Sequence, residues 1–267
     1  MPFAELNGVR THFLTEGFGQ KTVLVIHGLS PDLRMWDDGI VNGLNRTRYQ
    51  LVRYDIRGHG ESDAPDVGYC YRQYARDAVA LFDHLQLERV AVVGLSLGGG
   101  IALQLALDAP ERVAGAVLIG SSLPGRRLSA AREILTRWTD AMHNDGETAM
   151  QVWLKSGLFD PLRHDPKAFE PALVQMQRFS GKPVLQLEAD EEPVAVDRLS
   201  ELRVPVLTLV GEHDPPDFHA HSEAVAAEAA DAERVTIAGA GQCASVEKPQ
   251  DVLQHILPFL RRCAWAR

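Results

Sequence analysis

Short β-rich runs alternate with helical patterns along most of this chain, and the alternation constrains its fold more than any other feature. Unbroken apolar runs, such as residues 23–26 and 90–93, are typical of strands that are buried on both faces. Apolar residues at helical spacing follow many of them, as over residues 71–85. The sequence therefore predicts an α/β fold with a mostly parallel central sheet flanked by helices. The predicted strands cover residues 10–14, 23–26, 51–54, 90–93, 116–119, 206–210 and 235–237, and further helices cover 97–108 and 249–262.

Residues from about 124 to 199 interrupt this alternation. They contain several amphipathic helical patches without a convincing strand pattern, and prolines, Pro171 among them, are expected to mark helix boundaries. We interpret residues 124–199 as a helical cap inserted into a core of residues 1–123 and 200–267. Pockets for small molecules are lined mainly by apolar and aromatic side chains. Trp138 and Trp153 are therefore candidate substrate contacts, although packing inside the cap is the commoner role for such residues.

Composition excludes several other classes of function. A formal net charge of −9 disfavours a nucleic-acid partner, which would need a basic surface. Lysine and arginine are scattered, so a membrane-binding patch is not expected, and no apolar run approaches the ~18 residues of a membrane span. The opening residues lack a basic stretch followed by an apolar one, and the 3 cysteines lack metal-site spacing. We expect a cytoplasmic protein that acts on a small molecule without a metal or cofactor.

Gly94-Leu-Ser96-Leu-Gly98 carries the strongest chemical signal, because it follows a predicted strand and opens a predicted helix. In that context G-x-S-x-G forms a tight turn that lifts a nucleophilic serine, here Ser96, above the sheet. The N–H of Leu97, at the start of the helix, is a candidate donor to an oxyanion. His27-Gly28-Leu29 follows an earlier strand and places the N–H of Leu29 as the second donor. We assign His27 a structural role, because this motif contributes its backbone.

Several motifs together resemble the α/β-hydrolase superfamily over nearly the whole chain. They are H-G (27–28), D-x-R-G-H-G-x-S (55–62), G-x-S-x-G-G (94–99), G-E-x-D (211–214) and E-K-P (247–249). Within the superfamily the chain is most similar to the β-ketoadipate enol-lactone hydrolases and related small esterases. The resemblance implies a serine hydrolase of small esters or lactones, with Ser96 as nucleophile and Asp214 as the acid. Independently of the resemblance, Arg34, near the oxyanion loop, or an arginine of the cap could pair with a substrate carboxylate.

Position 242 departs from this pattern, because Gln242 stands where the family has its catalytic histidine. A glutamine amide cannot accept a proton near pH 7, and Cys243 has no neighbour in sequence that would activate its thiol. Three interpretations are open. In the first, the protein is a hydrolase whose base was deliberately substituted, which impairs hydrolysis and traps a ligand. In the second, it is a natural relative repurposed for non-hydrolytic chemistry, such as cyclisation or elimination, or for ligand binding. In the third, it is a hydrolase with a substitute base, for which His219 and His221 are candidates. Without its imidazole partner, a buried Asp214 is expected to be protonated more easily.

Overall fold

A computed structural model describes residues 2–45, 49–126, 129–144, 151–176, 178–186, 188–190 and 192–265. Its centre is an 8-stranded sheet in the order β1-β2-β4-β3-β5-β6-β7-β8. The two pairs that involve β2 are antiparallel and the other pairs are parallel, which confirms the predicted fold class. The strands are β1 (Phe3–Leu6), β2 (Val9–Glu16), β3 (Lys21–Ile26), β4 (Tyr49–Tyr54), β5 (Val90–Leu95), β6 (Val113–Ile119), β7 (Val206–Gly211) and β8 (Ala232–Ile237).

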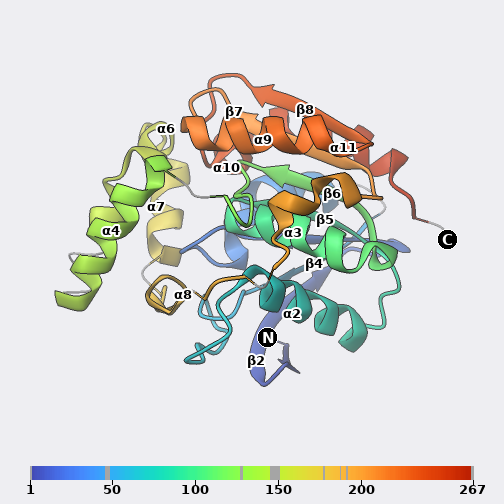
Figure 1. Cartoon of the computed structure of the whole chain (residues 1–267), viewed down its shortest axis with the longest axis horizontal. Coiled ribbons are helices and arrows are strands. Elements are labelled where there is room, and N and C mark those ends of the chain that lie inside the picture. Colours follow the sequence, from blue (N-terminus) through green and yellow to red (C-terminus); the bar gives the residue numbers. More distant parts are fainter. Residues whose placement is uncertain are drawn as a thin grey trace.

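Helices cover both faces of the sheet (Figure 1). Side chains alternate between the faces along each strand. Leu24 and Ile26 pack with α2 (Tyr71–His84), α3 (Leu97–Asp108) and α9 (Pro216–Glu228), whereas Val23 and Val25 pack with α11 (Pro249–Arg262). Shorter elements complete the core: η1 (Leu33–Trp36), η2 (Asp37–Val41), α1 (Asn42–Asn45), η3 (Pro110–Arg112) and α10 (Ala244–Glu247).

The first strand, β1, is one that the sequence analysis missed. It forms a hairpin with β2 through Asn7 and Gly8, whose φ angles are 49° and 77°. Left-handed backbone at both central residues is what an Asn-Gly turn of type I′ requires. This dipeptide was therefore the available signal for β1.

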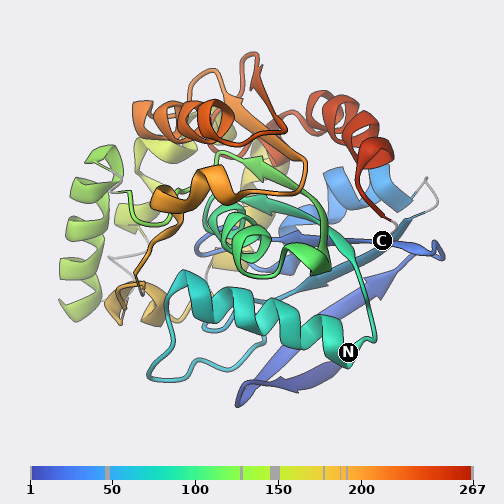
Figure 2. The ribbon, with the colours of Figure 1, turned by 45° about the vertical axis from the view of Figure 1, so that its right-hand side comes forward.

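The cap, which we define as residues 124–199, lies between β6 and β7 in the chain and to one side of the sheet (Figure 1; Figure 2). Its described elements are α4 (Ser129–Asn144), η4 (Gly157–Phe159), α6 (Asp160–Arg163), α7 (Pro166–Met176), α8 (Lys182–Leu185) and most of η5 (Ala195–Glu201). Residues 151–154 are also helical. The expectation that Pro171 ends a helix is wrong, because α7 continues through it and forgoes one backbone N–H donor. No helix in the described ranges is long and apolar enough to cross a membrane.

Phe82 tests how much packing in the hydrophobic core contributes to the stability of the fold. This side chain is fully buried between α2 and the sheet, whereas Phe18 is fully exposed. We expect Phe82→Ala to lower the free energy of unfolding by about 3–5 kcal/mol, through lost burial and the cavity left behind. Phe18→Ala should change it by less than about 0.5 kcal/mol. Urea unfolding followed by circular dichroism measures both, and equal losses would contradict the packing described here.

Candidate active site

Ser96 sits in a strained turn between β5 and α3. Its φ and ψ are 52° and −110°, a conformation that non-glycine residues rarely adopt. Hydrogen bonds hold it on both sides. The Ser96 N–H donates to the Ile119 carbonyl at 2.9 Å, and the Ser96 carbonyl accepts from the N–H groups of Gly100 and Ser122, both at 3.1 Å. The Ser122 hydroxyl adds a further bond at 3.0 Å, so a rigid frame presents the Ser96 side chain.

The glycines of the motif allow the helix to approach the sheet closely. A Cβ at Gly94 would lie 2.1 Å from the Gly98 carbonyl oxygen, and one at Gly98 would lie 2.3 Å from the Ile26 carbonyl oxygen. Neither position can hold a side chain without a backbone shift. The G-x-S-x-G spacing is therefore a steric requirement of this turn.

His27 orients the loop that follows β3. Its Nδ1 donates to the Gly28 carbonyl at 2.7 Å, and its Nε2 accepts from the Ile56 N–H at 3.0 Å. Burial lowers the pKa of His27, which favours this neutral form. Since the peptide between Gly28 and Leu29 is planar and trans, fixing the Gly28 carbonyl also fixes the direction of the Leu29 N–H. His27 thus has the structural role expected of it. Leu97 follows Ser96 as the first residue of α3, where an N–H has no acceptor within its helix.

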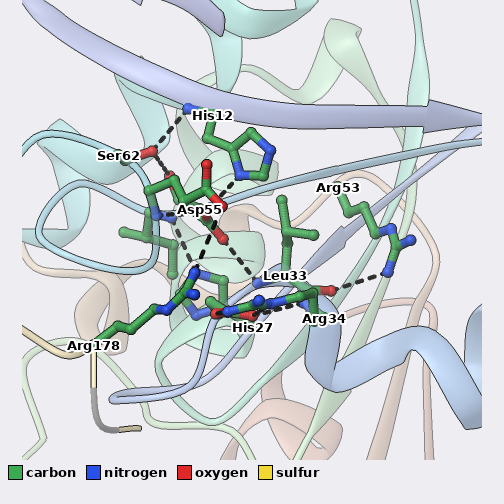
Figure 3. A network of polar contacts seen from close by, with 11 residues as sticks. His12, His27, Leu33, Arg34, Arg53, Asp55, Ser62 and Arg178 are labelled. Carbon is green, nitrogen blue, oxygen red and sulfur yellow. Dashed lines mark hydrogen bonds and ion pairs between the residues drawn. The ribbon is translucent and has the colours of Figure 1, made fainter. Parts of the chain in front are cut away.

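Asp55 anchors the same region through a network of polar contacts (Figure 3). One carboxylate oxygen accepts from the Leu33 N–H at 2.9 Å. The other accepts from the Glu61 N–H at 2.9 Å and lies 2.8 Å from His12 Nδ1. The Arg53 guanidinium donates a hydrogen bond to the carbonyl of the same Leu33 at 3.2 Å. This carboxylate therefore ties β2, the loop after β3 and the loop after β4 together.

Asp214 and Gln242 meet beside Gly120, at the carboxyl ends of β7, β8 and β6. A Cβ at Gly120 would lie 2.8 Å from Gln242 Nε2 and 3.4 Å from Asp214 Oδ2. Gln242 Nε2 donates to the Gly120 carbonyl at 2.8 Å, and Asp214 Oδ2 accepts from the Gly211 N–H at 2.8 Å. Asp214 Oδ1 and Gln242 Oε1 are both buried without a partner among the described residues. Asp214 and Gln242 therefore lie beside the same glycine, but no hydrogen bond joins their side chains.

Burial, opposed by the hydrogen bond from Gly211 and assisted by the nearby charge of Glu247, raises the pKa of Asp214 to about 7. This agrees with the expectation that a buried Asp214 without an imidazole is protonated easily. Glu247 also holds the loop around Gln242, since its carboxylate accepts from the N–H groups of Gly241 at 2.6 Å and Cys243 at 3.1 Å. Burial raises the pKa of the Cys243 thiol, so this residue does not supply a base.

A cavity of about 670 Å³ opens between the core and the cap beside Ser96. Leu29 and Gln242 line it together with Ser96, and Asp214 lies behind Gln242. Its walls are mostly apolar and include Met35, Leu135, Leu158, Phe159, Leu162, Met176, Phe218 and Val246. The apolar walls from Phe218, Met35 and Val246 were not anticipated from the sequence, because they come from segments distant along the chain.

The histidines proposed as substitute bases do not reach this cavity. All 10 histidines lie in the described ranges, and none is among the residues that line it. His221 Nδ1 lies 3.3 Å from the Ser121 carbonyl, and His219 lies 3.4 Å from an Arg234 nitrogen. The structure therefore gives no support to a substitute base. Nor do the described residues bring together three or more histidine, cysteine or acidic side chains that could hold a metal ion.

The candidate substrate contacts divide into two groups. Arg34 and Trp153 line the cavity, and Trp153 Nε1 donates to Ser30 Oγ at 2.8 Å. The Arg34 guanidinium is paired with the buried Asp32, which already neutralises its charge. Trp138 is not a lining residue in the described part of the chain. It is fully buried behind Trp153, with 5.4 Å between ring centroids, because the cap needs an apolar centre of its own.

Comparison with known proteins agrees with this geometry. A family model described as the alpha/beta hydrolase fold matches residues 21–156. The 3-oxoadipate enol-lactonase 2 of Acinetobacter baylyi is 27% identical over 212 residues, which cover 78% of this chain and 77% of the relative. The crystal structure of the enol-lactonase from Burkholderia xenovorans LB400 superposes with a TM-score of 0.86 at 23% identity, covering 98% of this chain and 100% of that one; it supports the fold alone.

Higher identity is confined to part of the chain. The dihydrolipoyllysine-residue acetyltransferase component of the acetoin cleaving system of Cupriavidus necator is 38% identical over 120 residues, or 44% of this chain and 31% of the relative. The match spans about a third of the length of the first curated relatives. These relatives therefore show the kind of fold rather than a shared substrate.

The raised pKa of Asp214 predicts a dependence of stability on pH. Its folded pKa, about 7, lies above the ordinary value of 3.8, so the folded state holds this proton more tightly than the unfolded state does. The Asp214 contribution to stability should therefore fall as pH rises from about 4 to about 7, by roughly 4 kcal/mol at most. Asp214→Asn should remove this loss, so the variant gains on the native protein across that window in urea unfolding. Gln242→His should reduce the loss of stability between about pH 4 and about pH 7, because an imidazolium beside Asp214 stabilises its ionised carboxylate. If the native protein and Asp214→Asn show the same dependence of stability on pH, the raised pKa of Asp214 is contradicted.

Proposed function

Because this chain belongs to the alpha/beta hydrolase fold family, we propose that it acts on a small carboxylic ester or lactone through Ser96, and that Gln242 makes hydrolysis slow. One observation carries the proposal: Ser96 and Gln242 line a single cavity that no histidine among the described residues enters. The proposal takes Ser96 as the nucleophile, Asp214 as the acid, and the N–H groups of Leu29 and Leu97 as the oxyanion donors. The missing element is the proton acceptor.

Each group has a defined part in the reaction. Ser96 Oγ attacks the substrate carbonyl, and the N–H groups of Leu29 and Leu97 stabilise the oxyanion that forms. In an intact hydrolase a histidine removes the serine proton and returns it to the leaving group. The Gln242 amide can hold the serine or the substrate by hydrogen bonds but cannot carry that proton. For attack to occur, water or the substrate itself must then accept the proton of Ser96, so a bound ester is hydrolysed slowly.

The apolar walls favour a substrate with a hydrocarbon portion. Burying apolar surface contributes roughly 25 cal/mol per Å², so a largely apolar cavity binds such a ligand without charge pairing. Arg34 is the candidate partner for a substrate carboxylate, although such a group would compete with Asp32 for the guanidinium. We therefore expect the cavity to bind a neutral ester or lactone more tightly than an anionic one.

A second function is favoured by the unpartnered acceptors of the site. Within the described part of the chain, Asp214 Oδ1 and Gln242 Oε1 are both buried without partners, and an oxyanion hole stabilises enolates as well as tetrahedral intermediates. A family member with this site could bind a ligand tightly, or catalyse a cyclisation or elimination, without a base at position 242. The experiment below separates this alternative from slow hydrolysis.

Gln242→His tests the proposal directly. If the site lacks only its base, the variant should hydrolyse p-nitrophenyl butyrate with a kcat higher by about 10²–10⁴-fold, the usual contribution of a positioned general base. The native protein should show only the slow turnover that an oxyanion hole and a pocket provide. Steady-state kinetics at pH 8 measures both.

Two controls complete this test. Ser96→Ala added to Gln242→His should abolish the gain, because base and nucleophile act as a unit. His221→Gln should leave the native rate unchanged, since His221 lies outside the cavity. An unchanged kcat in Gln242→His would reject slow hydrolysis in favour of the second function, and full-speed turnover by the native protein would reject both.

A further inference from the structure

The indole of Trp153 joins the cap to the loop between β3 and η1, which carries one candidate oxyanion donor. Trp153 lies in the helical segment 151–154, is 5% exposed and lines the cavity. Its Nε1 donates to Ser30 Oγ at 2.8 Å, across 123 positions of sequence. Ser30 is itself buried and directly follows Leu29. A hydrogen bond from the cap therefore ends one residue away from the Leu29 N–H.

The backbone of Ser30 is strained. Its φ angle is 81°, a left-handed value that residues with a side chain rarely adopt. Such a conformation costs free energy and persists only where the surrounding structure imposes it. The contact that Ser30 makes with the cap is therefore expected to matter for the shape of this loop.

Hydrogen bonds hold both ends of this loop but leave its middle to the cap. His27 and Asp55 fix the loop at Gly28 and Leu33, respectively. Among the described residues, the bond from the cap is the one hydrogen bond that residues 29–31 make. The middle of the loop therefore depends on a side chain that is distant in sequence.

The cap holds the indole of Trp153 in place. Arg163 of α6 donates to the Leu154 carbonyl at 2.6 Å and so fastens this segment to α6. The Trp153 ring packs against Trp138 and Phe159, with 5.4 and 5.7 Å between ring centroids. A donor that is packed in this way has a fixed direction, and so can constrain the group that accepts from it.

We propose that Trp153 is a positioning residue for the oxyanion hole, because its N–H holds Ser30 and so sets the direction of the Leu29 N–H. This inference rests on the proposed function, since it takes Leu29 as an oxyanion donor. His27 constrains the peptide between Gly28 and Leu29 at its carbonyl, and the bond to Ser30 constrains the same peptide from its other side. A donor stabilises the transition state only when it points at the position of the oxyanion. The oxyanion hole is then complete only when the cap is seated.

Backbone motion tests this role without any turnover. Trp153→Phe keeps a ring in the cap but removes the donor, and Ser30→Ala removes the acceptor. In both variants the amide order parameter of Leu29, measured by NMR relaxation, should fall from about 0.85, typical of rigid backbone, to below about 0.6. Trp138→Phe is the matched control, because it removes the same atoms from the cap but an N–H without a partner among the described residues. It should leave the order parameter of Leu29 unchanged.

A pair of substrates measures the oxyanion hole itself in the Gln242→His background. The substrates are p-nitrophenyl butyrate and its thiono analogue, in which C=S replaces C=O and the charge develops on sulfur, a weak hydrogen-bond acceptor. Removing a whole oxyanion donor costs about 10²–10³-fold in kcat, so a loosened Leu29 should lower the ratio of kcat/KM for ester over thionoester by roughly 10-fold. Trp153→Phe should show this change, whereas a defect in packing or binding would lower both rates and keep their ratio.

The outcomes separate this inference from the proposed function. Equal order parameters of Leu29 in Trp153→Phe and Trp138→Phe overturn the inference, whether both fall or neither does. An unchanged ratio in an active Gln242→His background also overturns it, because Leu29 is then not an oxyanion donor. If the order parameter falls in Trp153→Phe and Ser30→Ala alone while Gln242→His is inactive, the cap positions the loop and hydrolysis is rejected.

Discussion

The backbone of Ser96 is the constraint on which the rest of the site depends. Its left-handed φ costs about 1–3 kcal/mol for a residue with a side chain, and only a surrounding frame can maintain it. Bonds from Gly100 and Ser122 to its carbonyl supply that frame, and the absence of side chains at Gly94 and Gly98 makes room for it. Because this turn is fixed, Ser96 keeps a constant position relative to the loops after β3, β6 and β8, which surround it.

The loops after β7 and β8 bring two buried polar side chains, Asp214 and Gln242, together beside Gly120. Asp214 is buried, and this burial raises its pKa to about 7. Gln242 satisfies the Gly120 carbonyl but leaves its own oxygen without a partner among the described residues. A site built only for stability would fill this space with apolar side chains, which pack without desolvation cost. The presence of these buried polar groups supports the proposal that the cavity binds a ligand.

Much of the architecture follows from local pattern. Apolar runs and helical periodicity predicted the parallel strands, since burial on both faces leaves a clear mark in sequence. The motif around Ser96 could also be predicted from the sequence, because the steric requirements of the turn apply to residues that are adjacent in the chain. The edge strand β1 was missed, since a short, half-exposed strand has little apolar pattern, and only Asn7-Gly8 indicated its hairpin. The prediction at Pro171 was wrong because packing of α7 against α6 and η1 outweighs the roughly 3 kcal/mol that a proline costs inside a helix.

By itself, the sequence determined the fold class, the turn at Ser96 and the glutamine at position 242, because each depends on residues that are close along the chain. Tertiary structure alone decided which of two neighbouring cap tryptophans reaches the cavity, placing Trp153 on its wall and Trp138 behind it. It also decided that Gln175 lies on the cavity wall while Gln151 is exposed to solvent. Helical periodicity shows that a segment has a buried face, but what that face meets depends on how distant segments pack together.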